Sequence, residues 1–191
     1  GYEEKVERNM KEKLEPLEVP FIYDFVMSSK KYFDMKIPKS ELKKAFAHLS
    51  ASLSISIARR LSELIYISKV DKFDKYKVVI TGLAKKRGDD EVKIIVPTLF
   101  LTADEVIVGI EKLKSLIPKG LRTKDQIITK AHALADFMYI DKRLWVENSK
   151  FDSTRAIGVL TMELLYNQNN IKEENRKPQS TYFQAVLGHM D

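Results

Sequence analysis

The sequence contains no cysteine and only three histidines, His48, His132 and His189. Without cysteine the chain can form no disulfide and can supply neither a thiolate nucleophile nor a sulfur ligand for zinc. The histidines are not paired at helical spacing, as two metal ligands on one helix would be. Disulfide-stapled folds and thiol enzymes are therefore excluded, and the sequence offers no metal-ligand motif.

Long apolar runs are missing as well. No stretch approaches the roughly 18 apolar residues that a membrane-spanning helix requires. The first residues, GYEEKVERNMKEKLEP, are too charged for a signal peptide. We therefore expect a cytoplasmic protein that does not engage a membrane. The chain starts with Gly1 rather than methionine, which indicates a fragment of a longer protein.

Charge is abundant within an otherwise globular composition. Of the 191 residues, 44% are hydrophobic and 31% are charged, which suits one or two domains with a buried core. Lysine and arginine number 33 against 27 acidic residues, and the net charge is +6. This balance permits nucleic acid as a partner without establishing it. A basic region suited to phosphate contacts comprises Lys30, Lys31, Lys36, Lys39, Lys43 and Lys44.

Apolar residues recur at helical intervals over most of the chain and at strand intervals in one place. The helical pattern predicts helices over 20–33, 40–67, 102–116, 123–145 and 152–166 and a short one from Thr181. The weak helix formers between Ser50 and Ser56 predict a break in the second of these. Alternating apolar residues around GLAKKRGDDE predict an antiparallel hairpin. The fold class is therefore α+β, mainly helical with a small antiparallel sheet.

Ionisable residues stand out in four places, and each place alone has a plain structural explanation. Arg60 and Glu63 in ARRLSEL share a helix face and can form an ordinary surface ion pair. Lysines near a hairpin tip usually stay solvated and protect an edge strand. Arg155 in FDSTRAIGVL opposes the dipole of its helix, which favours an anionic partner. His189 in VLGHMD suits the C-terminal end of a helix.

Taken together and in this order, the motifs resemble the catalytic domain of tyrosine recombinases, the group that includes phage integrases, Xer-type recombinases and telomere resolvases. The matching residues are Arg60 in ARRLSE, Lys85 in TGLAKKR, Arg155 in DSTRAI and His189 in VLGHMD. The resemblance runs from about residue 40 to the end. It implies a catalytic domain over 37–191, preceded over 1–36 by a linker or helical lead-in.

Within this group the details are most similar to telomere resolvases, also called protelomerases. The paired arginines of ARRLSEL, the acidic turn after GLAKKR and the long interval between Arg155 and His189 carry this likeness. A phage or plasmid integrase with an insertion at 167–180 would look the same. Integrase-type site-specific recombination therefore stays an alternative to telomere resolution.

Two places depart from the family pattern. Recombinases commonly have histidine or lysine three residues before the second arginine, where this chain has Asp152; Lys150 is the nearby cation that could substitute. The nucleophilic tyrosine of the family follows the LGH histidine by roughly two to three helical turns, and this sequence stops at Asp191. We therefore expect a catalytic fragment cut before its nucleophile.

The resemblance implies that double-stranded DNA is cut by a tyrosine, which leaves a 3′-phosphotyrosyl link and a free 5′-hydroxyl, and is rejoined by the reverse reaction. The phosphotyrosine keeps the bond energy, so no nucleotide cofactor is expected. A dimer or higher oligomer on DNA is expected. One alternative from another class is a non-catalytic DNA-binding protein that keeps the fold. A further alternative is a structural protein in which the motifs are coincidental, and it predicts that the four matching residues lie apart in space.

The resemblance also implies a role for each matching residue. Arg60 and Arg155 would bind phosphate oxygens bidentately. Lys85 would protonate the 5′ oxygen as a general acid, and His189 would contact the phosphate or assist proton transfer. The supporting or DNA-contacting positions are Glu63, Lys86, Arg87, Lys150 and Asp152.

Overall fold

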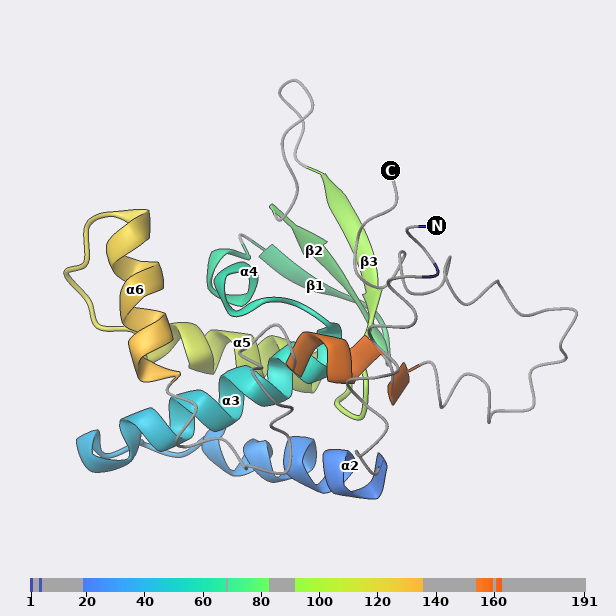
Figure 1. Cartoon of the computed structure of the whole chain (residues 1–191), viewed down its shortest axis with the longest axis horizontal. Coiled ribbons are helices and arrows are strands. Elements are labelled where there is room, and N and C mark those ends of the chain that lie inside the picture. The colour runs from blue at the N-terminus through green and yellow to red at the C-terminus, as the bar shows by residue number, and fades with distance from the viewer. Residues whose placement is uncertain are drawn as a thin grey trace, which may run out of the picture.

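The computed structural model describes residues 1, 4, 19–67, 69–82, 92–135, 154–159 and 161–162 (Figure 1). The labelled helices are α2 (Val19–Ser28), α3 (Leu42–Ile57), α4 (Leu61–Tyr66), α5 (Ala103–Ser115) and α6 (Lys124–Leu134), with the 3-10 turns η1 (Ser29–Tyr32) and η2 (Lys39–Glu41). The strands are β1 (Lys69–Asp74), β2 (Lys77–Thr81) and β3 (Lys93–Pro97), and residues 154–159 are also helical. Within the described residues the fold is mainly helical with a three-stranded antiparallel sheet, which confirms the predicted class of helices with a small antiparallel sheet.

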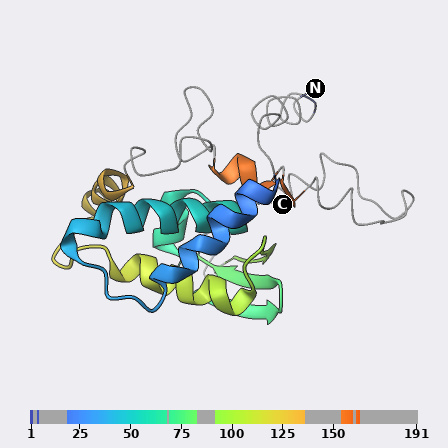
Figure 2. The same cartoon turned by 90° about the horizontal axis from the view of Figure 1, so that it is seen from below.

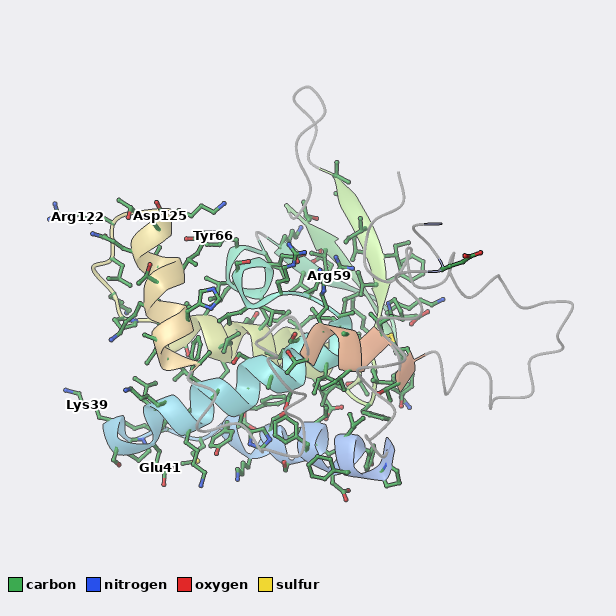
Figure 3. The ribbon with its side chains drawn as sticks, in the orientation of Figure 1. Lys39, Glu41, Arg59, Tyr66, Arg122 and Asp125 are labelled. Carbon is green, nitrogen blue, oxygen red and sulfur yellow. The ribbon has the colours of Figure 1, made fainter. Side chains whose placement is uncertain are left out.

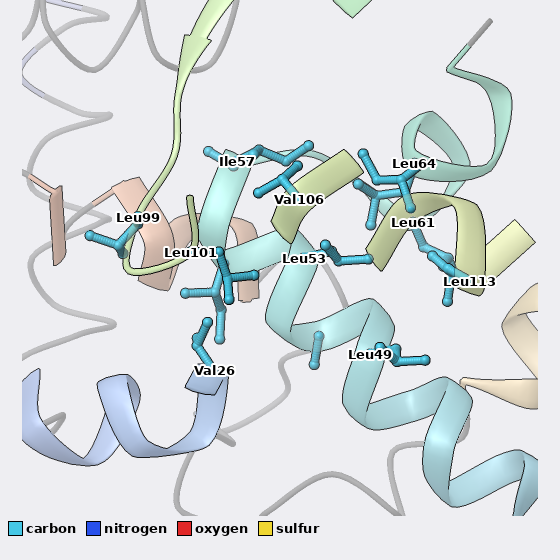
Figure 4. Packing of buried hydrophobic residues seen from close by; sticks show 14 of the residues in the cluster. Val26, Leu49, Leu53, Ile57, Leu61, Leu64, Leu99, Leu101, Val106 and Leu113 are labelled. Atoms are coloured by element: carbon cyan, nitrogen blue, oxygen red, sulfur yellow. The ribbon is translucent and has the colours of Figure 1, made fainter. Parts of the chain in front are cut away.

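Helix α3 is the centre of the core. It packs against α2, α4, α5 and α6, and from Leu49 to Ile57 every residue is buried. In Figure 2, α3 lies between α5 and the helical segment 154–159, and α2 crosses it. Leu49, Leu53 and Ile57 project from it toward apolar side chains of α4 and α5 (Figure 4). Burial on nearly all sides explains why the C-terminal half of this helix contains only apolar and small residues.

The break predicted near Ser50–Ser56 lies a few residues later, because α3 runs without interruption to Ile57. Serine weakens a helix when its hydroxyl competes for backbone groups. Here the hydroxyl of Ser50 donates within the helix to the carbonyl of Phe46 at 2.6 Å, which leaves the backbone ladder intact. The chain breaks instead at Ala58, which adopts the left-handed conformation (φ 53°, ψ 47°) that ends helices.

The predicted hairpin is confirmed as the β2–β3 pair, in which Val78 lies opposite Val96 and Ile80 opposite Ile94. Strand β1 joins on the other side of β2 and was not predicted from the sequence. Its sequence KVDKFD is mostly charged, and the register with β2 shifts between Lys72 and Asp74, so the two-residue alternation is interrupted.

The helix starts follow the sequence closely. Thr102 accepts a hydrogen bond from the backbone of Glu105, and Thr123 accepts one from that of Gln126, so both predicted helices begin with capping boxes. Part of the lead-in 1–36 packs into the same core, since Ile22, Val26 and Tyr32 are buried. The domain boundary at residue 37 stays a prediction. None of the helices in the described ranges is long and apolar enough to cross a bilayer.

Shortening a central α3 side chain should strongly destabilise the fold. Leu53 is fully buried, and Leu53→Ala should lower the free energy of unfolding by about 2–5 kcal/mol, because a cavity replaces its contacts. Val108→Ala on the exposed side of α5, where the side chain is 40% exposed, is the control and should cost about 1 kcal/mol or less. Urea unfolding measures both, and equal losses would contradict a core centred on α3.

An ion pair connects η1 to the first turn of α5 and should make the free energy of unfolding depend on pH. The Nζ of Lys30 lies 2.5 Å from Oε2 of Glu105. Burial acts to raise the pKa of the Glu105 carboxyl, but hydrogen bonds from Lys30 and Thr102 outweigh it and lower the pKa below its usual value. A lowered folded-state pKa contributes stability that is present above the unfolded pKa and is lost as pH falls.

The variant Glu105→Gln keeps a side-chain acceptor for the capping box and removes the titrating charge. Between about pH 5 and about pH 3, the wild-type protein should therefore lose more unfolding free energy than this variant. Urea unfolding across this range provides the comparison. Parallel pH curves for the two proteins would show that the Lys30–Glu105 pair contributes nothing.

Candidate functional site

The candidate site lies where α3 ends and α4 begins. After Ile57 the left-handed residue Ala58 turns the chain, and Arg59 and Arg60 connect it to α4. The hydroxyl of Ser54, in the last turn of α3, donates to the carbonyl of Arg59 at 2.7 Å. The turn thereby directs two consecutive arginines differently, because Arg59 is buried and Arg60 is exposed.

Arg59 is a buried cation with a defined set of neighbours. Only 3% of the residue is exposed. Its Nε donates to the carbonyl of Ile57 at 3.3 Å, and its Nη1 lies 3.6 Å from Oε2 of Glu63. Burial lowers the pKa of the Arg59 guanidinium, the charge of Glu63 opposes this, and the charge of Arg155 lowers the pKa further. Arg59 and Arg155 are therefore close enough for their charges to interact.

Glu63 serves both arginines of the turn. One carboxylate oxygen accepts the backbone N–H of Arg60 at 3.3 Å, and the other faces the guanidinium of Arg59. The sequence pairs Glu63 with the Arg60 side chain, three residues before it. In the structure Glu63 forms an ion pair with Arg59, four residues before it, and also accepts the backbone N–H of Arg60. Glu63 thus orients Arg59 and fixes the start of α4.

Arg155 comes from the helical segment 154–159, which packs against α3. The hydroxyl of Thr154 donates to that of Ser54 at 2.9 Å, across a hundred residues of sequence. At Gly158 the backbones touch, since a Cβ built there would lie 2.0 Å from the carbonyl oxygen of Ile55. Figure 3 shows Arg59 where α4, the sheet and this segment come together. Two distant parts of the chain therefore meet here, each with an arginine.

Two guanidinium groups whose charges interact suit one kind of ligand. Each guanidinium presents a planar fork of donors that matches phosphate oxygens, and it does so without changing protonation state near neutral pH. Within the described ranges, no cluster of histidine and carboxylate side chains could hold a metal ion. The positive charge of this arrangement therefore suits a phosphate ligand.

Several of the predicted site residues lie outside the described residues. These are Lys85, Lys86, Arg87, Lys150, Asp152 and His189. In the basic region before residue 45, Lys30 pairs with Glu105 and Lys31 lies 5.0 Å from the centre of the Tyr32 ring. The other lysines of that region are exposed, at Lys36, Lys39, Lys43 and Lys44.

No protein-family model matches this chain, and no curated protein matches it in sequence. A solved structure nevertheless shares its fold, and that structure is of a protein bound to DNA. It is protelomerase TelK complexed with substrate DNA, with a TM-score of 0.59 and 20% sequence identity. The match covers 89% of this chain and 33% of that one, so this chain spans about a third of the length of its structural relative.

The sequence motifs did not single out Arg59. Its neighbour Arg60 has the spacing to Glu63 that the family pattern requires, and the doubled arginine was the only signal for a second cation. Which of the two points inward depends on the left-handed conformation of Ala58. The contact at Gly158 was also missed, because a lone glycine within a helical pattern indicates nothing about which backbone approaches it.

Replacing Gly158 with alanine should separate the two arginine segments. The new Cβ would clash with backbone, which cannot rotate away, so Gly158→Ala should lower the free energy of unfolding by about 1–3 kcal/mol. Gly109→Ala is the matched control, because a Cβ there meets the ends of the Leu53 and Phe33 side chains at 3.0 and 3.2 Å. These flexible groups can move, so the loss should be smaller.

Thermal or urea unfolding of both glycine variants tests the packing at Gly158. If Gly158→Ala were as stable as the wild-type protein, the backbone contact with Ile55 could not be present in solution. A loss at Gly109→Ala equal to that at Gly158→Ala would contradict the proposed difference between backbone and side-chain neighbours.

Proposed function

We propose that this chain is the greater part of a catalytic domain that breaks and rejoins double-stranded DNA through a 3′-phosphotyrosine, in the manner of telomere resolvases. The observation that carries the proposal is the meeting of two arginine segments, at 59–60 and 154–159, in a fold shared with a DNA-bound protelomerase. Two of the four motifs that resemble tyrosine recombinases, those of Arg60 and Arg155, lie in these same two segments. The net charge of +6 agrees in sign with a DNA partner.

The proposed reaction transfers one phosphoryl group twice. A tyrosine oxygen attacks the scissile phosphorus, the bond to the 5′ oxygen breaks, and the 5′ oxygen takes up a proton. A 5′-hydroxyl then attacks the phosphotyrosine, the bond to tyrosine breaks, and the tyrosine regains its proton. The protein must stabilise negative charge on the non-bridging oxygens in both steps.

The arginines supply that charge stabilisation in the proposal. Arg60 is exposed and can reach a phosphate from the surface, and Arg155 comes from the opposing segment. Arg59 adds a third guanidinium beneath them, oriented by Glu63. Its buried charge raises the positive potential of the site where the phosphate would sit, in surroundings that screen charge less than water does.

The remaining roles come from the resemblance alone. Lys85 would donate the proton to the 5′ oxygen, and His189 would contact the phosphate or assist the tyrosine. The resemblance implies a nucleophilic tyrosine that follows the histidine of the LGH motif. Rejoining of each strand to its opposite strand would give hairpin ends, whereas exchange between two duplexes would make the protein an integrase.

A covalent-trapping assay tests the proposed chemistry. The protein expressed from its complete reading frame should form a denaturation-resistant adduct with a nicked duplex that releases its 5′ end on cleavage. Arg60→Lys and Arg155→Lys keep the charge but lose the bidentate fork, so each should slow adduct formation at least about a hundredfold. Arg122→Lys is the control, because Arg122 is exposed beside α6 (Figure 3).

The products and the trapped residue decide between the alternatives. A phosphotyrosine peptide found by mass spectrometry and hairpin-ended DNA would support telomere resolution, and recombined duplexes would support an integrase instead. Duplex binding without any adduct would favour the non-catalytic DNA-binding protein. Adduct formation at the wild-type rate in Arg155→Lys would overturn the assignment of this site.

A further inference from the structure

One serine connects the two arginine segments. The Ser54 hydroxyl donates its hydrogen to the carbonyl of Arg59 at 2.7 Å and accepts the hydrogen of the Thr154 hydroxyl at 2.9 Å. Ser54 is fully buried and Thr154 is 3% exposed, so water does not compete for these bonds. These two successive hydrogen bonds therefore link Thr154, the residue before Arg155, to the backbone of Arg59.

The direction of the Ser54 hydrogen bond is unusual for a helical serine. A serine within a helix commonly donates to a carbonyl in the preceding turn of its own helix, as Ser50 does to Phe46. Ser54 instead donates forward, past the end of α3, to a residue after the left-handed turn at Ala58. Its hydroxyl is thus used to hold the arginine turn and not to complete the helix.

A second contact secures the same pair of segments. Gly158 is one helical turn after Thr154, and its backbone rests on the carbonyl of Ile55, the residue after Ser54. Consecutive residues of α3 therefore hold two points of the segment 154–159, and Arg155 lies between these two points. The hydrogen bond fixes the position of the segment along α3, and the glycine allows its close approach.

The hydrogen bonds of Ser54 act against the electrostatic repulsion between Arg59 and Arg155. Arg59 and Arg155 are both cationic, and like charges in a partly buried site repel more strongly than they would in water. Glu63 offsets part of this repulsion from the side of α4. The Ser54 hydroxyl bonds the backbone carbonyl of Arg59 and the side-chain hydroxyl of Thr154, so it can keep the two segments together when no phosphate is bound.

We propose that Ser54 is a positioning residue of the phosphate site: its hydroxyl bonds both arginine segments, so that Arg60 and Arg155 are set for one phosphate before DNA binds, with the buried charge of Arg59 next to them. This inference rests on the proposed function. Ser54 touches neither DNA nor the reacting atoms. It acts through the placement of the guanidinium groups, and misplacement by about 1 Å can cost about a hundredfold in rate.

Paired variants separate the hydroxyl from its surroundings. Ser54→Ala removes the connecting oxygen, Thr154→Val removes the second hydroxyl at equal size, and Thr154→Ser restores that hydroxyl. Ser50→Ala is the matched control, since Ser50 lies on the same helix, is equally buried and bonds only within α3 in the described contacts.

Single-turnover cleavage and DNA affinity are measured for each variant of the protein from its complete reading frame. Ser54→Ala and Thr154→Val should slow cleavage at saturating DNA about ten- to a hundredfold. Their dissociation constants should change less than about threefold, since most affinity comes from phosphate contacts elsewhere. Thr154→Ser and Ser50→Ala should cleave within about threefold of the wild-type rate.

A second readout does not depend on cleavage. The Nε–H NMR signals of Arg59 and Arg155 report the surroundings of each guanidinium. Ser54→Ala should shift both signals, and Ser50→Ala should shift neither. Ser54→Ala combined with Thr154→Val should add little to Ser54→Ala alone, because Ser54→Ala already removes both hydrogen bonds.

The cleavage and NMR measurements distinguish a failure of the proposed function from a failure of the positioning role of Ser54. If the wild-type protein forms no covalent adduct, the proposed function fails, and unshifted arginine signals in Ser54→Ala would separately overturn the connection. If the wild-type protein cleaves DNA and Ser54→Ala cleaves at the same rate, the positioning role is wrong while the proposed function stands. An equal loss in Ser50→Ala would reduce the effect to general destabilisation of α3.

Discussion

The described structure depends on how closely other parts of the chain approach the last turns of α3. Small residues make this approach possible: the backbone of Gly158 rests on the carbonyl of Ile55, and Ser56 exchanges two hydrogen bonds with Leu99. Ser52 has a buried hydroxyl without a hydrogen-bond partner within the described part of the chain, so its value there is its size. Larger side chains would push these segments away from α3.

The turn at the end of α3 places two arginines beside this close packing. Ala58 takes a left-handed conformation, which costs a residue with a Cβ roughly 1 kcal/mol, and the hydrogen bond from Ser54 to Arg59 helps to hold it. The turn leaves Arg59 buried and Arg60 exposed. A buried cation without compensation is very costly, and Glu63 supplies part of that compensation from the first turn of α4. The close packing and the arginine cluster are thus parts of one arrangement.

The arginine turn and the segment 154–159 are structural features that can be considered together with a fold similarity that sequence comparison does not detect. At 20% identity, the match to protelomerase TelK shows the fold, and the arginine cluster supplies the chemical reason to consider a phosphate ligand. The proposed DNA breaking and rejoining joins these two observations. Because α3 packs against α4 and contacts the segment 154–159, a change at Ser54 is expected to act on phosphate geometry without touching DNA.

The sequence by itself determined the periodic elements and their starts. The capping residues Thr102 and Thr123 and the β2–β3 hairpin were predictable, because they depend on neighbours within a few residues. Only the tertiary structure decided which arginine is buried, that α3 continues through its serines, and that Ser54 meets Thr154. Those outcomes depend on contacts across as many as a hundred residues, and no local pattern encodes which backbone will lie against which helix.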